Sequence, residues 1–99
     1  MILFKIYTED VNRERIERIC LDYLLFGTGF TITTGTGYWL GHREKCVVIE
    51  VVGREADKDQ VLRAASKIKT ANKQEVVMVV EAVADNVHYI GKQEKHSGK

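Results

Sequence analysis

The residues with the clearest chemical potential lie in two short segments. Residues 35–45 have the sequence Gly-Thr-Gly-Tyr-Trp-Leu-Gly-His-Arg-Glu-Lys and lie between two stretches that are typical of strands, and Gln74-Glu75 precedes an apolar run. A hairpin needs turn residues only at its tip, and residues 40–43 supply them. The glycines, aromatic residues and carboxylates beside the tip therefore require a separate explanation.

Glycine inside a strand marks either a bulge or a close approach by a ligand or another backbone. A bulged, twisted hairpin and a ligand site are therefore both open interpretations of this cluster. Packing at an interface would also explain the aromatic pair, and a solvated or capped turn would explain the polar residues. The candidate site residues are Gly35, Gly37, Tyr38, Trp39, Glu44, Gln74 and Glu75.

Several other kinds of site are disfavoured. His42 and Cys46 are four residues apart across a turn, and no second pair has ligand spacing, so we expect no metal. Gly35-Thr-Gly37 opens no helix and no phosphate-loop lysine follows it, so we expect no bound cofactor. Neither Ser66 nor Ser97 has an obvious base beside it, which disfavours a Ser-His-Asp arrangement.

The elements that must position these residues follow from the hydrophobic pattern. It predicts an α+β, ferredoxin-like β-α-β-β-α-β fold, in which two helices cover one face of a four-stranded antiparallel sheet. Apolar spacing in the helices predicts buried stripes, comprising residues 16, 19, 20, 23 and 24 in the first and residues 61, 62, 65, 68 and 71 in the second. The predicted strands are 1–7, 29–40, 45–52 and 75–83, with a short edge strand at 88–90, and the predicted helices are 12–26 and 57–72.

The sheet face without helices is expected to be too apolar to remain in water. Its candidate residues are Leu3, Tyr7, Val47 or Val48, Val51, Val77 and Val79. A partner subunit would cover such a face, and a homotrimer packed through its sheets is the simplest assembly. Glu50 lies in the same valine-rich segment, and we expect it to reach solvent or to form a structural ion pair.

Composition fits one domain, which we place at residues 1–90, followed by a flexible C-terminal tail at 91–99. The 99 residues carry a net charge of +1 with interspersed signs, so nucleic acid is not an expected partner. The N-terminus lacks the pattern of a signal peptide, and no apolar run is long enough to span a membrane. Cys20 and Cys46 are expected to be buried free thiols, which favours a cytoplasmic location.

The pattern Gly37-Tyr38, a short turn, Glu44-Lys45 and Gln74-Glu75 resembles the small phage-encoded S-adenosylmethionine lyases, long called SAM hydrolases. The strand and helix order is also similar to that of the trimeric PII and CutA proteins. The lyase resemblance covers roughly residues 30–80. It implies an enzyme that cleaves S-adenosylmethionine to 5′-methylthioadenosine and homoserine lactone, at sites between subunits of a trimer and without a metal.

The same resemblance implies that Tyr38 and Glu44 are the catalytic residues. It places Gln74 and Glu75 at the site as substrate-binding residues, and we add Gly35, Gly37 and Trp39 to that group. Two alternatives remain: a non-enzymatic PII-like trimer that binds a nucleotide or adenosyl ligand, and a small protein-interaction or inhibitor module.

Overall fold

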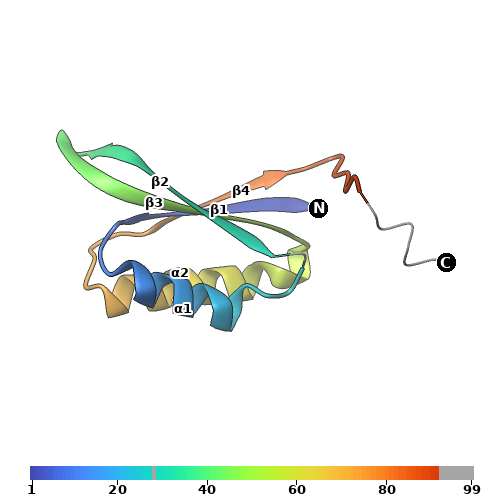
Figure 1. Cartoon of the computed structure of the whole chain (residues 1–99), viewed down its shortest axis with the longest axis horizontal. Helices are drawn as coiled ribbons and strands as arrows, with labels where there is room; N and C mark the ends of the chain where they lie inside the picture. The colour runs from blue at the N-terminus through green and yellow to red at the C-terminus, as the bar shows by residue number, and fades with distance from the viewer. Residues whose placement is uncertain (28, 92–99) are drawn as a thin grey trace.

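A computed structural model describes residues 1–27 and 29–91 of the chain (Figure 1). The elements are β1 (Ile2–Glu9), α1 (Arg13–Tyr23), β2 (Phe30–Trp39), β3 (His42–Gly53), a 3-10 turn (Glu55–Asp57), α2 (Lys58–Ala71) and β4 (Met78–Val83). The strands form one sheet in the order β2-β3-β1-β4, in which every neighbouring pair is antiparallel. The predicted ferredoxin-like α+β fold is confirmed.

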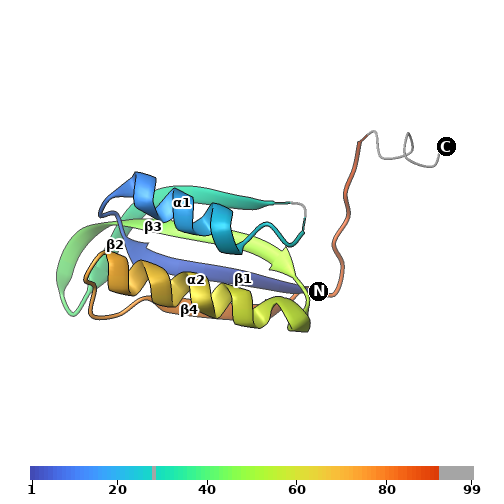
Figure 2. The ribbon, with the colours of Figure 1, turned by 90° about the horizontal axis from the view of Figure 1, so that it is seen from below.

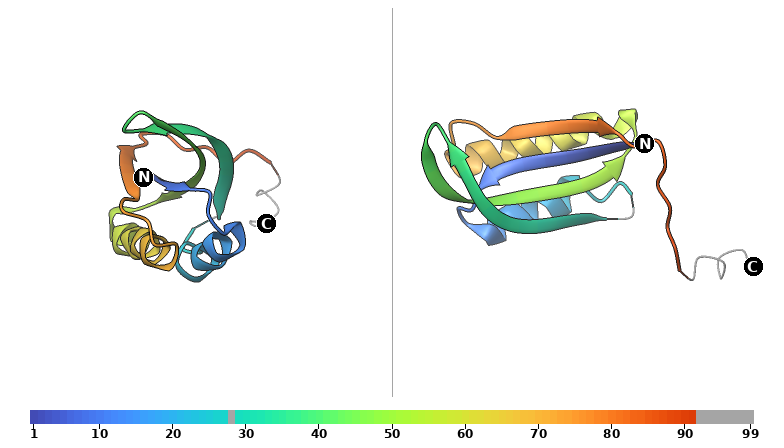
Figure 3. Two further views of the ribbon diagram at one scale, coloured as in Figure 1. Left: turned by 90° about the vertical axis from the view of Figure 1, so that its left-hand side faces the viewer. Right: turned by 90° about the horizontal axis from the view of Figure 1, so that it is seen from above.

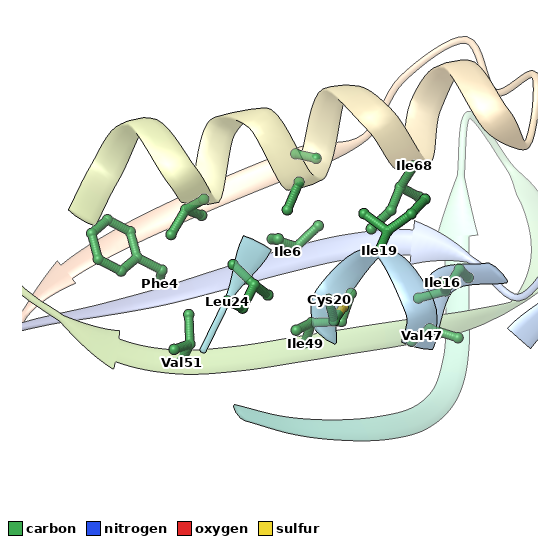
Figure 4. Packing of buried hydrophobic residues seen from close by; sticks show 13 residues of the cluster. Phe4, Ile6, Ile16, Ile19, Cys20, Leu24, Val47, Ile49, Val51 and Ile68 are labelled. Atoms are coloured by element: carbon green, nitrogen blue, oxygen red, sulfur yellow. The ribbon is translucent and has the colours of Figure 1, made fainter. Parts of the chain in front are cut away.

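Both helices lie on the same face of the sheet (Figures 2 and 3). Phe4 and Ile6 of β1 point to this face and are fully buried, as their alternation with Leu3, Lys5 and Tyr7 predicts. Figure 4 shows them packed against the helices and against β3. The helices contribute Ile16, Ile19, Cys20, Leu24, Val61, Ala64, Ala65 and Ile68 to the core.

The helix stripes agree with the sequence analysis except at one position. Leu62 was expected on the buried face, but its side chain is 42% exposed and Ala64 lies in the core instead. α1 begins after Asn12, whose side chain accepts a hydrogen bond from the backbone N–H of Arg15. This N-cap fixes where the first helix starts.

The last predicted strand starts later than the sequence indicates. β4 begins at Met78, and residues 75–77 lie outside the ladder although Val76 and Val77 continue its apolar pattern. The short strand expected at 88–90 is not a strand in the structure. Of the predicted tail, residues 92–99 lie outside the described residues.

The face without helices carries part of the expected apolar set. Leu3 pairs with Val52 and Tyr7 pairs with Val48, and these side chains are half-buried. Val51, Val77 and Val79 instead pack against the core on the helix side, as does the fully buried Val47. The strand register accounts for this difference from the predicted face, because Val51 pairs with Phe4 and Val79 pairs with Ile6, and both partners are core residues.

Glu50 lies on the open face, where its carboxylate is 3.5 Å from Nζ of Lys5 on the neighbouring strand. This is the structural ion pair that the sequence analysis allowed for. Among the described helices, neither is long and apolar enough to cross a membrane.

Candidate functional site

The predicted site residues gather at the end of the sheet where the β2–β3 hairpin extends past β1. The pairing of β1 with β3 ends at Glu9 and Cys46, whereas the hairpin continues to the pair Trp39 and His42. This distal part rises away from the helices and arches over the open face (Figures 1 and 3). A hydrogen bond of 3.0 Å from the backbone N–H of Asp10 to the carbonyl of Lys45 supports its base.

A hollow of about 420 Å³ lies beneath the hairpin. One wall comes from the hairpin, the floor from the end of β1, and the opposite wall from the segment between α2 and β4. Its volume lies within the range typical of small-ligand sites, about 300 to 1,000 Å³. The lining residues are Tyr7, Thr8, Glu9, Gly37, Tyr38, Trp39, Glu44, Cys46, Lys73, Gln74, Glu75, Val76 and Met78.

The glycines of the hairpin are not explained by its own geometry. The register between β2 and β3 is unbroken from Phe30 and Val51 to the pair next to the turn, so the hairpin contains no bulge. A Cβ at Gly35 or Gly37 would lie 3.7 Å from Sγ of Cys46, which is an ordinary contact distance. Glycine is therefore not required by packing here, and its absent side chain leaves space inside the hollow at Gly37.

The hairpin turn itself does require special backbone conformations. Leu40 and Gly41 form a two-residue loop with positive φ values of 51° and 82°. This is the conformation of a type I′ turn, in which asparagine followed by glycine is preferred. Leucine is costly there, and its side chain is 83% exposed.

The aromatic pair beside the turn is held at the mouth of the hollow. Strand alternation places Trp39 on the same face as Gly37 and Tyr38 on the opposite face. Both residues nevertheless line the hollow, and their side chains are 47% and 72% exposed, respectively. They can therefore contact a ligand without first leaving a packed environment.

Glu44 faces Gly37 across the hairpin and is half-buried. Among the described residues, its carboxylate has neither an ion-pair nor a hydrogen-bond partner, and the same holds for Glu75. Glu9 is a third carboxylate residue in the lining, and Lys73 is the one lysine or arginine there. The hollow therefore favours a ligand with a positive charge.

The side chain of Gln74 forms hydrogen bonds within the protein. Its Oε1 accepts a hydrogen bond of 3.1 Å from the backbone N–H of Glu9, and its Nε2 donates to Oγ1 of Thr8. The residue thus ties the segment before β4 to the end of β1. The interpretation of Gln74 as a turn cap missed this contact, because its partners are 65 and 66 residues away in the sequence.

The structure brings together all the predicted site residues except Gly35, which lies two residues further from the turn than Gly37. Sequence reasoning missed the contribution of β1, namely Tyr7, Thr8 and Glu9. No local signal marks these residues. Their position follows from the central place of β1 between β3 and β4.

The two cysteines lie in different surroundings, and Cys46 is the one that lines the hollow. Within residues 1–27 and 29–91, no group of three or more His, Cys, Asp or Glu residues is arranged to hold a metal ion. Both cysteines are free, but only Cys20 is buried as expected, whereas Cys46 is half-buried in the hollow. Burial, assisted by the charge of Glu17, raises the pKa of Cys20 to about 12, which makes that thiol inert.

Comparison with solved structures places this fold among known ones. A DUF3240 family protein from Shewanella baltica superimposes with a TM-score of 0.73 at 12% identity, covering 91% of this chain and 96% of the other. A phage SAM lyase in its apo state gives a TM-score of 0.62 at 14% identity, with coverages of 88% and 92%. A nitrogen regulatory PII-like protein from Thiomonas intermedia, bound to ADP, AMP and bicarbonate, gives 0.59 at 17% identity, with coverages of 87% and 94%.

These similarities establish the fold that PII-like and CutA proteins share. At such low identity they do not transfer an activity. No family model and no curated protein matches the sequence. The function must therefore be argued from the hollow.

Proposed function

We propose that this chain is an S-adenosylmethionine lyase that forms 5′-methylthioadenosine and homoserine lactone at the hollow beneath the β2–β3 hairpin. The observation that carries the proposal is the half-buried carboxylate of Glu44, which has no partner among the residues that the structure describes and lies in the hollow with Tyr38 and Glu75. A carboxylate in this situation is stabilised by a cationic ligand, and S-adenosylmethionine carries both a sulfonium and an ammonium group. The fold similarity to a phage SAM lyase adds support.

The reaction needs no external nucleophile. The carboxylate of the substrate attacks its own γ-carbon, a C–O bond forms, and the C–S bond breaks. The electron pair of that bond moves to sulfur, which leaves as the neutral thioether of methylthioadenosine. This reaction consumes and releases no proton, and its stoichiometry includes no metal ion and no redox partner.

The protein accelerates such a reaction mainly by holding the methionine arm in a folded conformation. Orientation of this kind contributes up to about 7 to 11 kcal/mol in ideal intramolecular reactions. Tyr38 would direct the substrate carboxylate through its hydroxyl, and Glu44 would attract the sulfonium or ammonium end. Trp39 offers an aromatic surface to the adenine, and the missing side chain of Gly37 leaves room for it.

Glu44 serves binding more than rate in this scheme. The positive charge on sulfur disappears as the C–S bond breaks, so an anionic neighbour stabilises the ground state more than the transition state. Glu75 lies on the opposite wall and would bind the second cationic group of the substrate.

The hollow is open, and we propose that a second subunit completes it in a homotrimer. Leu3, Tyr7, Val48 and Val52 on the face without helices, together with the exposed Met78 and Val80 of β4, form an apolar surface beside the hollow. Covering this surface with other subunits would bury it and enclose the ligand.

A PII-like sensor that binds a nucleotide or adenosyl ligand without cleaving it is the second candidate. The solved PII-like neighbour with bound ADP and AMP favours it. The lining argues against a diphosphate ligand, because Glu9, Glu44 and Glu75 outweigh the charge of Lys73. An adenosyl ligand with a cationic sulfur suits the hollow better.

The experiment that separates these functions is incubation of the purified protein with S-adenosylmethionine, followed by liquid chromatography and mass spectrometry. A lyase yields methylthioadenosine with homoserine lactone, and Tyr38→Phe lowers the yield. Tyr89→Phe is the matched control, because it removes the same hydroxyl from the chain beyond β4, outside the hollow. Intact substrate that is retained by the protein would favour the sensor, and no binding at all would favour an interaction module.

A further inference from the structure

We propose that Gln74 is a positioning residue that fixes residues 75–77 as a wall of the hollow and does not itself contact the ligand. The effect of Gln74 on ligand binding rests on the function proposed above. Its effect on the position of residues 75–77 does not.

β4 pairs with β1 only from Ile2 to Tyr7, and its own first residue is Met78. The backbone N–H of Glu9 therefore has no partner from β4. The side-chain amide of Gln74 takes that place, with Oε1 at 3.1 Å from the N–H of Glu9 and Nε2 donating to Oγ1 of Thr8. The Gln74 side chain thus supplies the hydrogen bond to β1 that β4 would have made had it started earlier.

The backbone of Gln74 is held independently of its side chain. The N–H of Lys73 donates to the carbonyl of Thr70 at 3.3 Å, and the N–H of Gln74 donates to that of Lys69 at 3.0 Å. With Lys73 at a φ of 54°, these bonds form a Schellman motif at the end of α2.

Two side chains add further ties to α1 and the turn before it. Nδ2 of Asn72 donates to the carbonyl of Val11 at 2.8 Å, and Nη1 of Arg15 donates to the carbonyl of Ala71 at 2.7 Å. The chain is therefore anchored up to Gln74 and again from Met78 onward. Among the described residues, no backbone hydrogen bond joins residues 75–77 to β1, and the side-chain amide of Gln74 is the hydrogen-bonded connection to the end of that strand.

Residues 75–77 are consequently a short span fixed at both ends and free of the ladder. Glu75 and Val76 line the hollow from this span and are exposed, whereas Val77 packs against the core. Releasing the amide of Gln74 would let Glu75 and Val76 move relative to Tyr38 and Glu44. The Oε1 and Nε2 atoms of Gln74 each have one partner in the protein, and these two bonds fix the orientation of its amide.

Thr8 allows a sharp test, because it is the other half of the clamp. Thr8→Val removes the hydroxyl while leaving Gln74 intact, and Gln74→Leu removes the amide. Thr8→Ser keeps the hydroxyl and is the matched control. The double variant Thr8→Val/Gln74→Leu shows whether the two residues act as one unit.

The first measurement is nuclear magnetic resonance of the backbone amides in protein without ligand. We expect Gln74→Leu and Thr8→Val to increase the hydrogen exchange of Glu9 and to lower the order parameters of Glu75 and Val76, with Thr8→Ser like the wild type. Unchanged order of Glu75 and Val76 in both variants would overturn the proposal, whatever the protein does with S-adenosylmethionine.

The second measurement is the affinity for S-adenosylmethionine by calorimetry. Loss of one hydrogen bond that positions the wall corresponds to about a five-fold weaker Kd. We expect this loss in Thr8→Val and in Gln74→Leu, with no further loss in the double variant. Wild-type affinity in Thr8→Val beside weak binding in Gln74→Leu would mean that Gln74 contacts the ligand, which overturns the proposal.

The two hypotheses fail separately. A wild-type protein that does not bind S-adenosylmethionine contradicts the proposed function, while the amide measurements still decide whether Gln74 fixes the wall.

Discussion

Replacing Glu44 by glutamine tests the proposed electrostatics of the hollow with little change in shape. The carboxylate has no partner among the described residues and is half-buried, so no internal ion pair is lost with its charge. A hydrogen bond to a charged group is worth about 1.5 to 3 kcal/mol. Because solvent reaches Glu44, the lower half of this range applies, which corresponds to about a 13- to 45-fold weaker affinity.

The expected kinetic signature is specific. Since the sulfonium charge vanishes in the transition state, Glu44→Gln should raise KM by this factor and leave kcat unchanged or slightly higher. Added salt should raise the KM of the wild type more than that of the variant, because screening weakens the same attraction.

The assay is the rate of methylthioadenosine formation as a function of substrate and sodium chloride concentration. Glu55→Gln makes the same chemical change at an exposed position before α2 and should leave both constants at wild-type values. A fall in kcat at constant KM would refute the reasoning, because it would require Glu44 to act in the transition state.

Three further outcomes follow from the structure. Leu40→Asn should relieve the positive-φ leucine and stabilise the fold by roughly 1 kcal/mol, which calorimetry would detect as a Tm increase of about 4 to 8 °C; an unchanged or lower Tm would contradict the turn assignment. Val48→Lys places a charge on the open sheet face and should convert an oligomer to monomers in analytical ultracentrifugation, whereas an unaltered mass would exclude this face from the interface. At pH 8 a thiol reagent should modify Cys46 while Cys20, with a pKa raised to about 12, stays unmodified until the protein unfolds; equal labelling rates in the native state would disprove the burial argument.

Much of the fold was predictable because each element carries a local periodic signal. The alternation around Phe4 and Ile6 and the helical spacing of Ile16, Ile19 and Cys20 each reflect one buried face. In a strand that is apolar at every position, no alternation indicates which sheet face a valine side chain occupies. The apolar pattern therefore predicts the wrong sheet face for Val51 and Val79. The register with β1 shows that both lie on the face that the helices cover.

The candidate site was only partly predictable for a related reason. Tyr38, Glu44 and Glu75 stand out because polar and aromatic residues there serve no turn. The roles of Thr8 and Gln74 depend on a contact between segments 66 residues apart, and on β4 starting later than its apolar pattern indicates. Such a contact is a property of the sheet order and not of either segment.

The unbroken pairing through Gly37 makes the depth of the hollow adjustable at a single position. Because the ladder continues past this glycine and a Cβ would meet only Cys46 at an ordinary distance, alanine fits there without disturbing the hairpin, and serine and valine extend the same side chain by one and two further atoms. Each adds volume at the same point of the hollow. In the series Gly37→Ala, Gly37→Ser and Gly37→Val, the side chain at position 37 grows stepwise. The side-chain size at which ligand binding is lost shows how closely the ligand approaches β2.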